Sequence, residues 1–268
     1  MTTPVERVGP SAAPPYPQGR NLLAGKTVLV TAAAGTGIGF ATARRCMEEG
    51  AQVFVSDIHE RRLGEAVARL TPPGSTPVSS RICDVTKQGD VETLIESAIG
   101  ALGRIDVVVN NAGLGGSAAV VEMTDEQWHK VLDVSLTSVF RMTRAVLPHM
   151  FQRGSGAIVN NASVLGWRAQ PLQAHYAAAK AGVMAFTRCA AMEAAAHGVR
   201  INAVAPSIAM HAFLDRVTSP ELLAELRSRE AFGRTAETWE VANSIVFLAS
   251  DLASYMTGEV LSVSSQHP

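Results

Sequence analysis

Residues 27–39 read TVLVTAAAGTGIG, an apolar run that leads into a glycine-rich turn and then into an Ala-rich segment. The run is apolar on both faces, which is typical of a parallel strand covered by helices on both sides. Gly35, Gly37 and Gly39 allow a tight turn and a close approach of the backbone to a ligand. A helix that begins at this turn presents free N–H groups and a positive dipole end. The stretch therefore predicts a strand–turn–helix unit that can hold a phosphate group.

The same alternation of short β-branched runs and longer amphipathic segments continues along the chain. The predicted strands are residues 27–31, 52–56, 78–82, 105–110, 157–161, 200–204 and 259–263. The predicted helices are residues 38–49, 60–70, 87–102, 124–151, 174–197 and 237–250. Thr124 with Gln127 forms a capping-box pattern, and Gly50 is placed to end the first helix. Alternating strands and helices predict an α/β fold, a single domain with a doubly wound parallel sheet of about seven strands.

The first twenty residues differ from the rest of the chain. They contain Pro4, Pro10, Pro14, Pro15 and Pro17 and lack the apolar segment of a signal peptide. We interpret residues 1–20 as a flexible Pro-rich tail. Residues 21–268 show no composition break and no internal repeat, so we expect them to form one domain.

The composition of the chain argues against several classes of partner. Its 268 residues carry 23 Lys+Arg and 24 Asp+Glu, a formal net charge of -1, so no basic excess favours nucleic acid or an anionic membrane. No apolar run reaches the ~18 residues that span a bilayer. Cys46, Cys83 and Cys189 form no C-x-x-C pair, and His211 and His267 lack metal-site spacing. We expect a cytoplasmic protein without a bound metal.

Acidic residues follow the second and third predicted strands. Asp57 lies 18 residues beyond Gly39, where a carboxylate accepts hydrogen bonds from ribose hydroxyls and repels a 2′-phosphate. That position favours NAD over NADP, although Asp57 could instead cap the next helix. Arg61 and Arg62 would weaken the preference if one turned toward the ribose. Asp84 could bond the adenine amine, cap the following helix, or do both.

A second group of polar residues forms a candidate catalytic site. Tyr176 and Lys180 are four residues apart on a predicted helix and therefore share a face. Ser163 follows the predicted strand 157–161, at the sheet edge where α/β proteins bind ligands. A Tyr-x-x-x-Lys pattern alone is common and can be an aromatic ring packed under a lysine. Its combination with Ser163 and with Asn110-Asn111-Ala112-Gly113 is much rarer.

Together these motifs, over about residues 25–264, resemble the short-chain dehydrogenase/reductase family. The resemblance implies a Rossmann-type fold, hydride transfer and usually a homotetramer. It implies that Tyr176 is the general acid/base, that Ser163 holds the substrate oxygen, and that Lys180 binds the nicotinamide ribose and stabilises the tyrosinate. An ammonium and an oxidised nicotinamide would both favour the tyrosinate, lowering a pKa near ~10. The cofactor-binding residues we expect are Gly35, Thr36, Gly37, Ile38, Asp57, Asp84, Val85, Asn111, Tyr176, Lys180 and Ile208.

The chain departs from the family pattern at four places. Ala32 replaces the first glycine of the turn, and the turn is one residue longer. Ser135 stands where the family often has a fourth catalytic residue, an asparagine; we expect Ser135 to order a water near Lys180. Ser207 replaces a glycine, and His211 stands where a threonine often contacts the nicotinamide amide. Ser264-Ser265-Gln266-His267-Pro268 replaces an Asp-Gly-Gly ending.

These departures resemble one subfamily. Residues 31–39, 160–168, 206–209 and 266–268 are similar to the bacterial steroid-catabolic dehydrogenases that act on a hydroxylated methyl-oxo-indane carboxyl-CoA. That resemblance implies NAD-dependent oxidation of a ring secondary alcohol to a ketone. Two alternatives remain open: a 3-oxoacyl-(ACP or CoA) reductase that uses NADPH, and a non-catalytic dinucleotide-binding sensor.

The residues around the Ser163 loop are candidates for substrate binding. Trp167 suits a fused alicyclic ring, and Arg168 suits a carboxyl-derived or CoA phosphate group; the alternatives are a packed tryptophan and a solvated arginine. Residues 207–235 lack a regular pattern and correspond to the family's substrate lid. His175 is expected at the surface or at an interface.

Small side chains along residues 124–150 and 174–197 would allow close helix packing. The family's tetramer would place this packing at a subunit boundary. The alternative is packing on the sheet within one subunit.

Overall fold

A seven-stranded parallel sheet forms the centre of the molecule in the computed structural model, which describes residues 12–210 and 219–266. The strand order is β3-β2-β1-β4-β5-β6-β9. The strands are β1 (Thr27–Val30), β2 (Gln52–Asp57), β3 (Ser79–Ile82), β4 (Val107–Asn110), β5 (Gly156–Asn161), β6 (Val199–Pro206) and β9 (Val260–Val263). The predicted α/β class and the seven-stranded sheet are confirmed. The order reverses between β1 and β4, and ligands of open α/β sheets bind at the carboxyl edge beside such a reversal.

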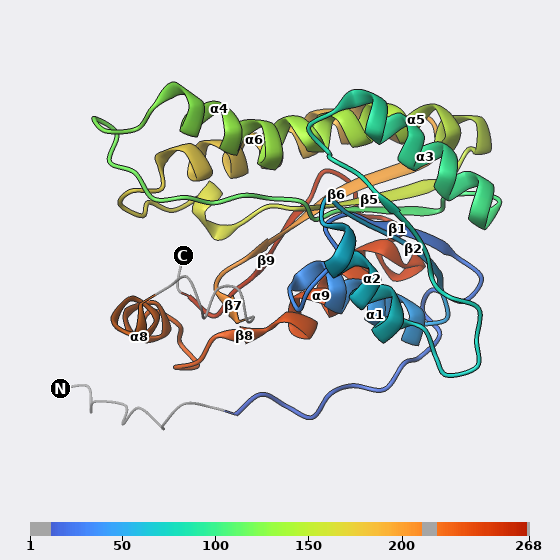
Figure 1. Cartoon of the computed structure of the whole chain (residues 1–268), viewed down its shortest axis with the longest axis horizontal. Coiled ribbons are helices and arrows are strands. Elements are labelled where there is room, and N and C mark those ends of the chain that lie inside the picture. The colour runs from blue at the N-terminus through green and yellow to red at the C-terminus, as the bar shows by residue number, and fades with distance from the viewer. Residues whose placement is uncertain (1–11, 211–218, 267–268) are drawn as a thin grey trace.

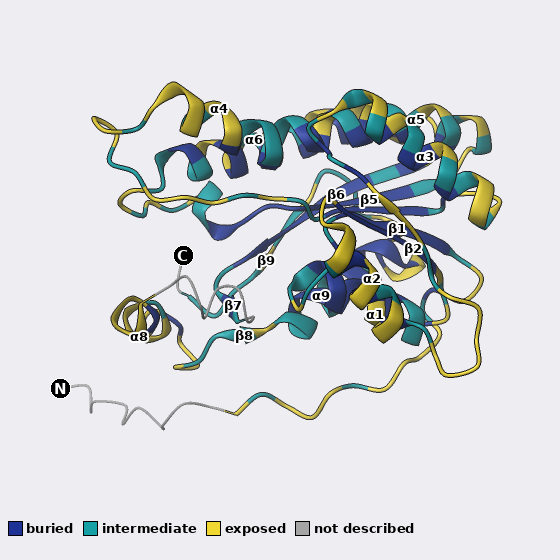
Figure 2. Cartoon of the chain, viewed as in Figure 1, coloured by how far each residue is buried: buried dark blue, intermediate teal, exposed yellow. Residues whose placement is uncertain are grey.

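Helices cover both faces of the sheet (Figure 1). One layer holds α3 (Gln88–Leu102), α4 (Asp125–Leu132), α5 (Ser138–Arg153) and α6 (Ala174–Ala195). The other holds α1 (Ile38–Glu48), α2 (Glu60–Leu70) and α9 (Thr238–Ala249). Each layer has its own apolar cluster, and the central strands are buried between the two, as the dark blue ribbons of Figure 2 show. Burial on both faces explains the continuous apolar runs of β1 and β4.

Two predicted boundary signals are present in the structure. The Thr124 hydroxyl accepts a hydrogen bond from the backbone of Gln127, and the Gln127 side chain accepts one from the backbone of Thr124, so the capping box is confirmed. Gly50 follows the last helical residues of α1 with φ 87°, the left-handed conformation that ends a helix. Predicted and observed ends of the other elements differ by a few residues.

Two parts of the chain differ from the prediction. The single helix expected over residues 124–151 is interrupted by a π-helical turn at Asp133–Thr137, which separates α4 from α5. The stretch 207–235 contains α8 (Pro220–Ser228) and β7 (Ala209–Met210), which pairs with β8 (Ala236–Glu237) just beyond it. Both escaped prediction because a π turn leaves the helical periodicity nearly intact, and two-residue strands carry no periodicity.

The N-terminal segment contacts the outer helices where the structure describes it. Tyr16 donates a hydrogen bond to Glu48 of α1 (2.6 Å) and packs edge-on against Trp239 of α9. The carbonyl of Pro17 accepts a hydrogen bond from Arg45. Residues 12–20 of the expected flexible tail therefore lie along α1 and α9, and residues 1–11 lie outside the described residues.

Residues 12–210 and 219–266 contain neither a membrane-spanning helix nor a cluster of metal-binding side chains. No helix in those ranges is long and apolar enough to cross a bilayer. The same ranges contain no group of three or more His, Cys, Asp or Glu side chains arranged to hold a metal ion. Cys46, Cys83 and Cys189 are free thiols, of which only Cys189 is exposed.

Candidate active site

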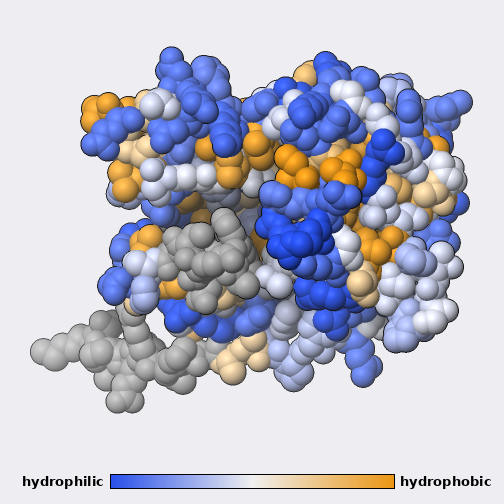
Figure 3. All heavy atoms as spheres, viewed as in Figure 1, coloured by the Kyte–Doolittle hydropathy of each residue, from blue (hydrophilic) through white to orange (hydrophobic). Residues whose placement is uncertain are grey.

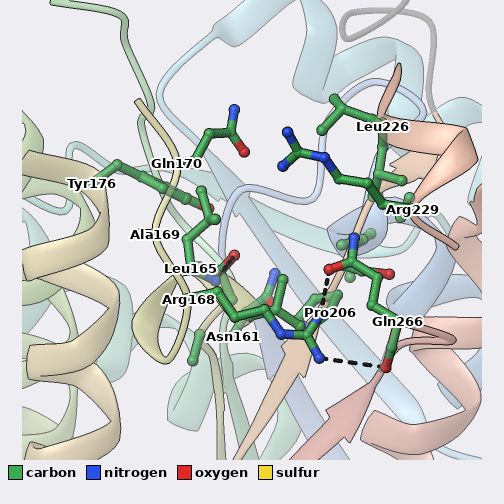
Figure 4. Close-up of a pocket in the computed structure, with 17 residues that line it drawn as sticks. Asn161, Leu165, Arg168, Ala169, Gln170, Tyr176, Pro206, Leu226, Arg229 and Gln266 are labelled. Atoms are coloured by element: carbon green, nitrogen blue, oxygen red, sulfur yellow. Dashed lines mark hydrogen bonds between the residues drawn. The ribbon is translucent and has the colours of Figure 1, made fainter. Parts of the chain in front are cut away.

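A cleft of about 290 Å³ opens at the carboxyl edge of β5 and β6. The surface is hollowed on this side, between the α4–α6 layer and α8 (Figure 3). Its walls come from five segments: the start of α1, the end of β5 with the loop after it, the first turn of α6, the end of β6 with β7, and α8 with the C-terminal segment (Figure 4). The lining residues are Ile38, Asn161, Ala162, Ser163, Val164, Leu165, Arg168, Ala169, Gln170, Tyr176, Pro206, Ser207, Ile208, Ala209, Leu226, Arg229 and Gln266.

Ser163 and Tyr176 line this cleft, and Lys180 lies buried next to Tyr176. Ser163 lies just beyond β5, and its hydroxyl accepts a hydrogen bond from the backbone of Leu165. Tyr176 lies in the first turn of α6, and Lys180 follows one turn later with its Nζ 5.5 Å from the centre of the tyrosine ring. The Lys180 ammonium donates to the carbonyl of Asn161 at 2.6 Å. A strand end and a helix start thus place three polar side chains around one small volume.

Burial controls the titration of this group. It raises the pKa of Tyr176, and the hydrogen bond with Ser163 offsets part of that rise. It lowers the pKa of Lys180 to about 8, because the lysine is only 2% exposed. The sequence analysis expected a lowered pKa for Tyr176. That expectation depends on a bound oxidised nicotinamide; in the chain alone, loss of hydration acts in the opposite direction.

A chain of hydrogen bonds joins Lys180 to the glycine-rich turn. The side-chain amide of Asn161 donates to Oδ1 of Asn111 at 3.0 Å. Nδ2 of Asn111 donates in turn to the carbonyls of Thr31 (3.2 Å) and Ala32 (3.1 Å). Asn111 therefore fixes the end of β1 and the start of the turn relative to the residues that surround Lys180.

Ser135 lies fully buried in the π-helical turn near Lys180. Its Oγ accepts from the backbone N–H of Leu114 (2.9 Å) and donates to the carbonyl of the same residue (3.0 Å). A hydroxyl has one proton, so only an acceptor position remains for the water expected beside Lys180. Gly113 passes close to both side chains, since a Cβ there would lie 3.4 Å from the Lys180 Nζ.

The glycine-rich turn fits a pyrophosphate group. Gly35 has φ 84° with open space around it, and Gly37 is the N-cap of α1 without a capping side chain. The first turn of α1 contains no acidic residue, so its free N–H groups and positive dipole end have no competing anion there. A Cβ on Gly39 would lie 2.4 Å from the carbonyl oxygen of Ala32, which requires glycine at this position.

Asp57 ends β2 beside this turn. One carboxylate oxygen accepts from the backbone of Ala34 (3.2 Å) and the other from the backbone of His59 (3.0 Å). Burial raises the pKa of Asp57, and the nearby charge of Arg62 acts in the opposite direction. Arg61 is paired with Glu65 instead. A carboxylate has about four acceptor positions, so Asp57 retains room for ribose hydroxyls.

The fold and the site agree with known proteins. A short-chain dehydrogenase from Mycobacterium smegmatis, solved by crystallography, superposes with a TM-score of 0.85 at 57% identity, covering 96% of this chain and 99% of that one. A family model described as "Enoyl-(Acyl carrier protein) reductase" matches residues 32–265. The chain belongs to the short-chain dehydrogenase/reductase family. Members of this family bind a nicotinamide dinucleotide and catalyse oxidoreduction, so the chain is an oxidoreductase.

Two curated relatives differ in their substrates. A Mycobacterium tuberculosis protein named (5R,7aS)-5-hydroxy-7a-methyl-1-oxo-2,3,5,6,7,7a-hexahydro-1H-indene-carboxyl-CoA reductase is 62% identical over 96% of this chain and 99% of its own length. A 3-oxoacyl-[acyl-carrier-protein] reductase from Thermotoga maritima is 40% identical over 90% of this chain and 97% of its own length. The relatives therefore share the fold and differ in the thioester substrate that their names give.

Three other residues expected to bind the cofactor lie in different surroundings: Asp84, Val85 and Ile208. Asp84 accepts two hydrogen bonds from Thr86, and the N-cap of α3 is Lys87, so the prediction that Asp84 caps this helix is wrong. Asp84 closes a short turn ahead of the helix. The side chain of Val85 packs in the core, which leaves its backbone as the part able to meet a ligand. Ile208 lines the cleft.

Arg69, a basic residue that no sequence motif indicates, contacts the glycine-rich turn. Arg69, near the end of α2, donates from Nη1 to the carbonyl of Gly35 at 3.0 Å. Its guanidinium also lies over the ring of Phe40, 4.1 Å from the ring centre. Arg69 therefore holds the turn that is one residue longer than the family pattern. No local signal could have identified it, because the contact spans 34 residues of sequence.

The candidate substrate residues separate into two groups. Arg168 lines the cleft, whereas Trp167 is 51% exposed and is not part of the lining. His175, expected at the surface or at an interface, is 2% exposed; that prediction is wrong, because the first turn of α6 packs against Gly116. Sequence reasoning also missed the cleft residues Gln170, Leu226, Arg229 and Gln266. His211 lies outside the described residues.

Proposed function

We propose that this oxidoreductase uses NAD⁺ to oxidise a ring secondary alcohol to a ketone on a hydroxy-methyl-oxo-indane carboxyl-CoA thioester. The observation that carries the proposal is the grouping of Ser163 and Tyr176, which line the cleft, with the buried Lys180 beside Tyr176. The 62% identical relative named for such a substrate supports the choice of thioester. That relative's name calls it a reductase; we propose oxidation as the physiological direction.

Each of the three residues has a defined task in this mechanism. Tyr176 accepts the proton of the substrate hydroxyl through its own phenolic oxygen. Ser163 holds the same substrate oxygen by a hydrogen bond, because it lines the same cleft as Tyr176. Lys180 supplies a positive charge that favours the tyrosinate, and its contact with the Asn161 carbonyl fixes its position. Ser135 supports this group by holding the backbone of Leu114.

The bound nicotinamide supplies the acceptor for the hydride that leaves the alcohol carbon. We propose that Gly35, Thr36, Gly37 and Ile38 hold its pyrophosphate and that Asp57 holds the adenosine ribose. Asp84, Val85, Asn111 and Ile208 complete the expected binding residues. The buried carboxylate of Asp57 would repel a 2′-phosphate, which favours NAD over NADP.

A substrate panel tests the proposed activity. Purified protein is given NAD⁺ or NADP⁺ with the bicyclic hydroxy-thioester and with straight-chain 3-hydroxyacyl-CoA thioesters, and reduced cofactor is followed by absorbance. The proposal expects NADH with the bicyclic thioester and at least tenfold lower kcat/KM with NADP⁺. Cofactor binding without turnover of any alcohol would favour the sensor alternative.

The second candidate function is a 3-oxoacyl-thioester reductase that uses NADPH. The Thermotoga maritima relative favours it, and so does the charge of Arg62 beside Asp57. Under this alternative the straight-chain 3-oxoacyl thioesters would be reduced faster than the bicyclic substrate is oxidised. NADPH would then be preferred over NADH, opposite to the preference that Asp57 predicts.

We also propose a cytoplasmic homotetramer in which residues 21–268 form one domain. The exposed apolar side chains Phe140 of α5 and Met192 of α6 support a subunit boundary on these helices. The free thiols are consistent with a reducing compartment. Sedimentation at micromolar protein should give a species of four chains, and a stable monomer would overturn the assembly.

A further inference from the structure

The C-terminal segment closes one side of the cleft through a network centred on Glu230. Glu230 lies just after α8 and is 5% exposed. One of its carboxylate oxygens accepts from the hydroxyl of Ser265 at 2.7 Å, and the other accepts from Nε2 of Gln266 at 2.8 Å. The carbonyl of Ser265 accepts from the backbone of Ala231 at 2.9 Å. We call Glu230 with residues 264–266 the C-terminal clasp.

The C-terminal clasp is hydrogen-bonded to Arg168, which lines the cleft. Oε1 of Gln266 accepts a hydrogen bond from Nη1 of Arg168, and the Gln266 carbonyl accepts from Nη2 at 3.4 Å (Figure 4). Gln266 therefore stands between a carboxylate and a guanidinium. A primary amide can do this because it carries both donors and an acceptor. A glutamate at 266 would repel Glu230, and a lysine would repel Arg168.

Among the described residues, Arg168 is held by neutral oxygens. Within the residues that the structure describes, no carboxylate lies within ion-pair distance of Arg168, whereas Arg229 across the cleft is paired with Glu225. A guanidinium held by neutral oxygens keeps its full charge and its remaining N–H groups for an anion. Both arginines line the same cleft as Tyr176 and Leu226.

We propose that Gln266 and Glu230 are positioning residues that hold Arg168 in the cleft wall, where its guanidinium binds a phosphate group of the coenzyme A part of the substrate. This rests on the function proposed above, which supplies the thioester. The alicyclic ring then lies at Ser163 and Tyr176, and the coenzyme leaves past α8. The unusual C-terminal residues thus select for a phosphorylated carrier, while the inner residues carry out the oxidation.

Binding of free coenzyme A tests the proposal without any turnover. Calorimetry is done with saturating NAD⁺, so that the adenine nucleotide cannot enter the dinucleotide site, and pantetheine is the ligand that lacks phosphates. Arg168→Ala and Gln266→Ala should each weaken coenzyme A binding about tenfold, and Gln266→Glu should weaken it further. The double variant should bind no more weakly than Arg168→Ala, because Gln266 acts through Arg168.

A matched control lies on the surface of α8. Arg227 is exposed and outside the cleft lining, so Arg227→Ala should leave the affinity for coenzyme A unchanged. The KM for NAD⁺ and the melting temperature of Gln266→Ala should match those of the wild type, whereas a purely structural role would change them.

The outcomes separate this proposal from the proposed function. Equal coenzyme A affinity in wild type, Arg168→Ala and Gln266→Ala would overturn the phosphate site, even if the bicyclic alcohol is oxidised. Equal weakening for pantetheine and coenzyme A would also overturn it. Coenzyme A binding that depends on Gln266, without oxidation of any ring alcohol, would support the site and remove the proposed activity.

Discussion

The two sides of the active site are built by different kinds of contact. On the cofactor side, the glycine turn is held mainly by backbone groups and by side chains at adjacent strand ends, such as Asp57 and Asn111. On the substrate side, Arg168 meets Gln266 across 98 residues of sequence through side-chain hydrogen bonds. We propose that the cofactor is held by groups at the ends of adjacent parallel strands, whereas the substrate meets a side-chain pair that joins a loop to the C-terminal segment.

The largest expected effect is a loss of turnover without a loss of cofactor binding. Tyr176→Phe keeps the ring and removes the hydroxyl that accepts the proton, so kcat should fall about 10²–10⁴-fold. Affinity for NAD⁺, measured by fluorescence titration, should change less than about twofold. The matched control is Tyr255→Phe, because Tyr255 is fully exposed. An unchanged kcat in Tyr176→Phe would contradict the assignment of the base.

The second prediction tests the close packing of backbone at Gly39 in the glycine-rich turn. In Gly39→Ala the new Cβ would lie 2.4 Å from the Ala32 carbonyl and from Nδ2 of Asn111, so the turn must shift. We expect a loss of about 2–3 kcal/mol in unfolding free energy and weaker NAD⁺ binding. Gly64 on α2 has open space, so Gly64→Ala should instead stabilise by about 0.5–1 kcal/mol. Similar urea midpoints for the two variants would contradict the close packing at Gly39.

The third prediction concerns the lysine that joins the two sides. The pKa of Lys180 is about 8 in the folded protein and near 10.5 in the unfolded chain. Between these values the unfolded chain binds more protons, so its unfolding free energy should rise by about 2 kcal/mol from pH 8 to pH 10. Lys180→Met should lose this rise in urea unfolding. A rise of equal size in Lys180→Met would show that other groups cause it.

The smallest expected effect concerns the altered first position of the turn. Ala32 has φ 49°, a left-handed conformation that favours the glycine found in the family pattern. Ala32→Gly should therefore raise the unfolding free energy by about 0.5–1 kcal/mol. Ala34→Gly in the same turn, where φ is not positive, should lower stability by a similar amount. Thermal unfolding of both variants measures the sign of each change in stability. Destabilisation by Ala32→Gly would contradict backbone strain at Ala32.

The contrast between the two sides also explains what the sequence could predict. Alternating runs predicted the sheet, and the ends of those runs indicated Asp57, Asn111 and Ser163, because parallel strands end at one edge. The Tyr176 and Lys180 pair was predictable from helical spacing. These predictions concern placement; the catalytic roles of the residues remain proposals.

The features that escaped prediction depend on tertiary contacts. Trp167 was expected at the cleft because it directly follows the Ser163 loop, yet it is 51% exposed and does not line the cleft. Arg69, Gln266 and Glu230 act on partners that are distant in sequence, so no motif identifies them. Burial likewise set the direction of the Tyr176 pKa, and burial depends on the whole fold.

The central claim is oxidation of a ring alcohol by NAD⁺ at Ser163, Tyr176 and Lys180. The most direct measurement incubates the protein with the hydroxy-methyl-oxo-indane carboxyl-CoA thioester and NAD⁺, then weighs the product by mass spectrometry while NADH is quantified. The account predicts a product lighter by two hydrogens and one NADH for each ketone formed. Unchanged substrate without NADH, beside active conversion of a straight-chain thioester, would contradict it.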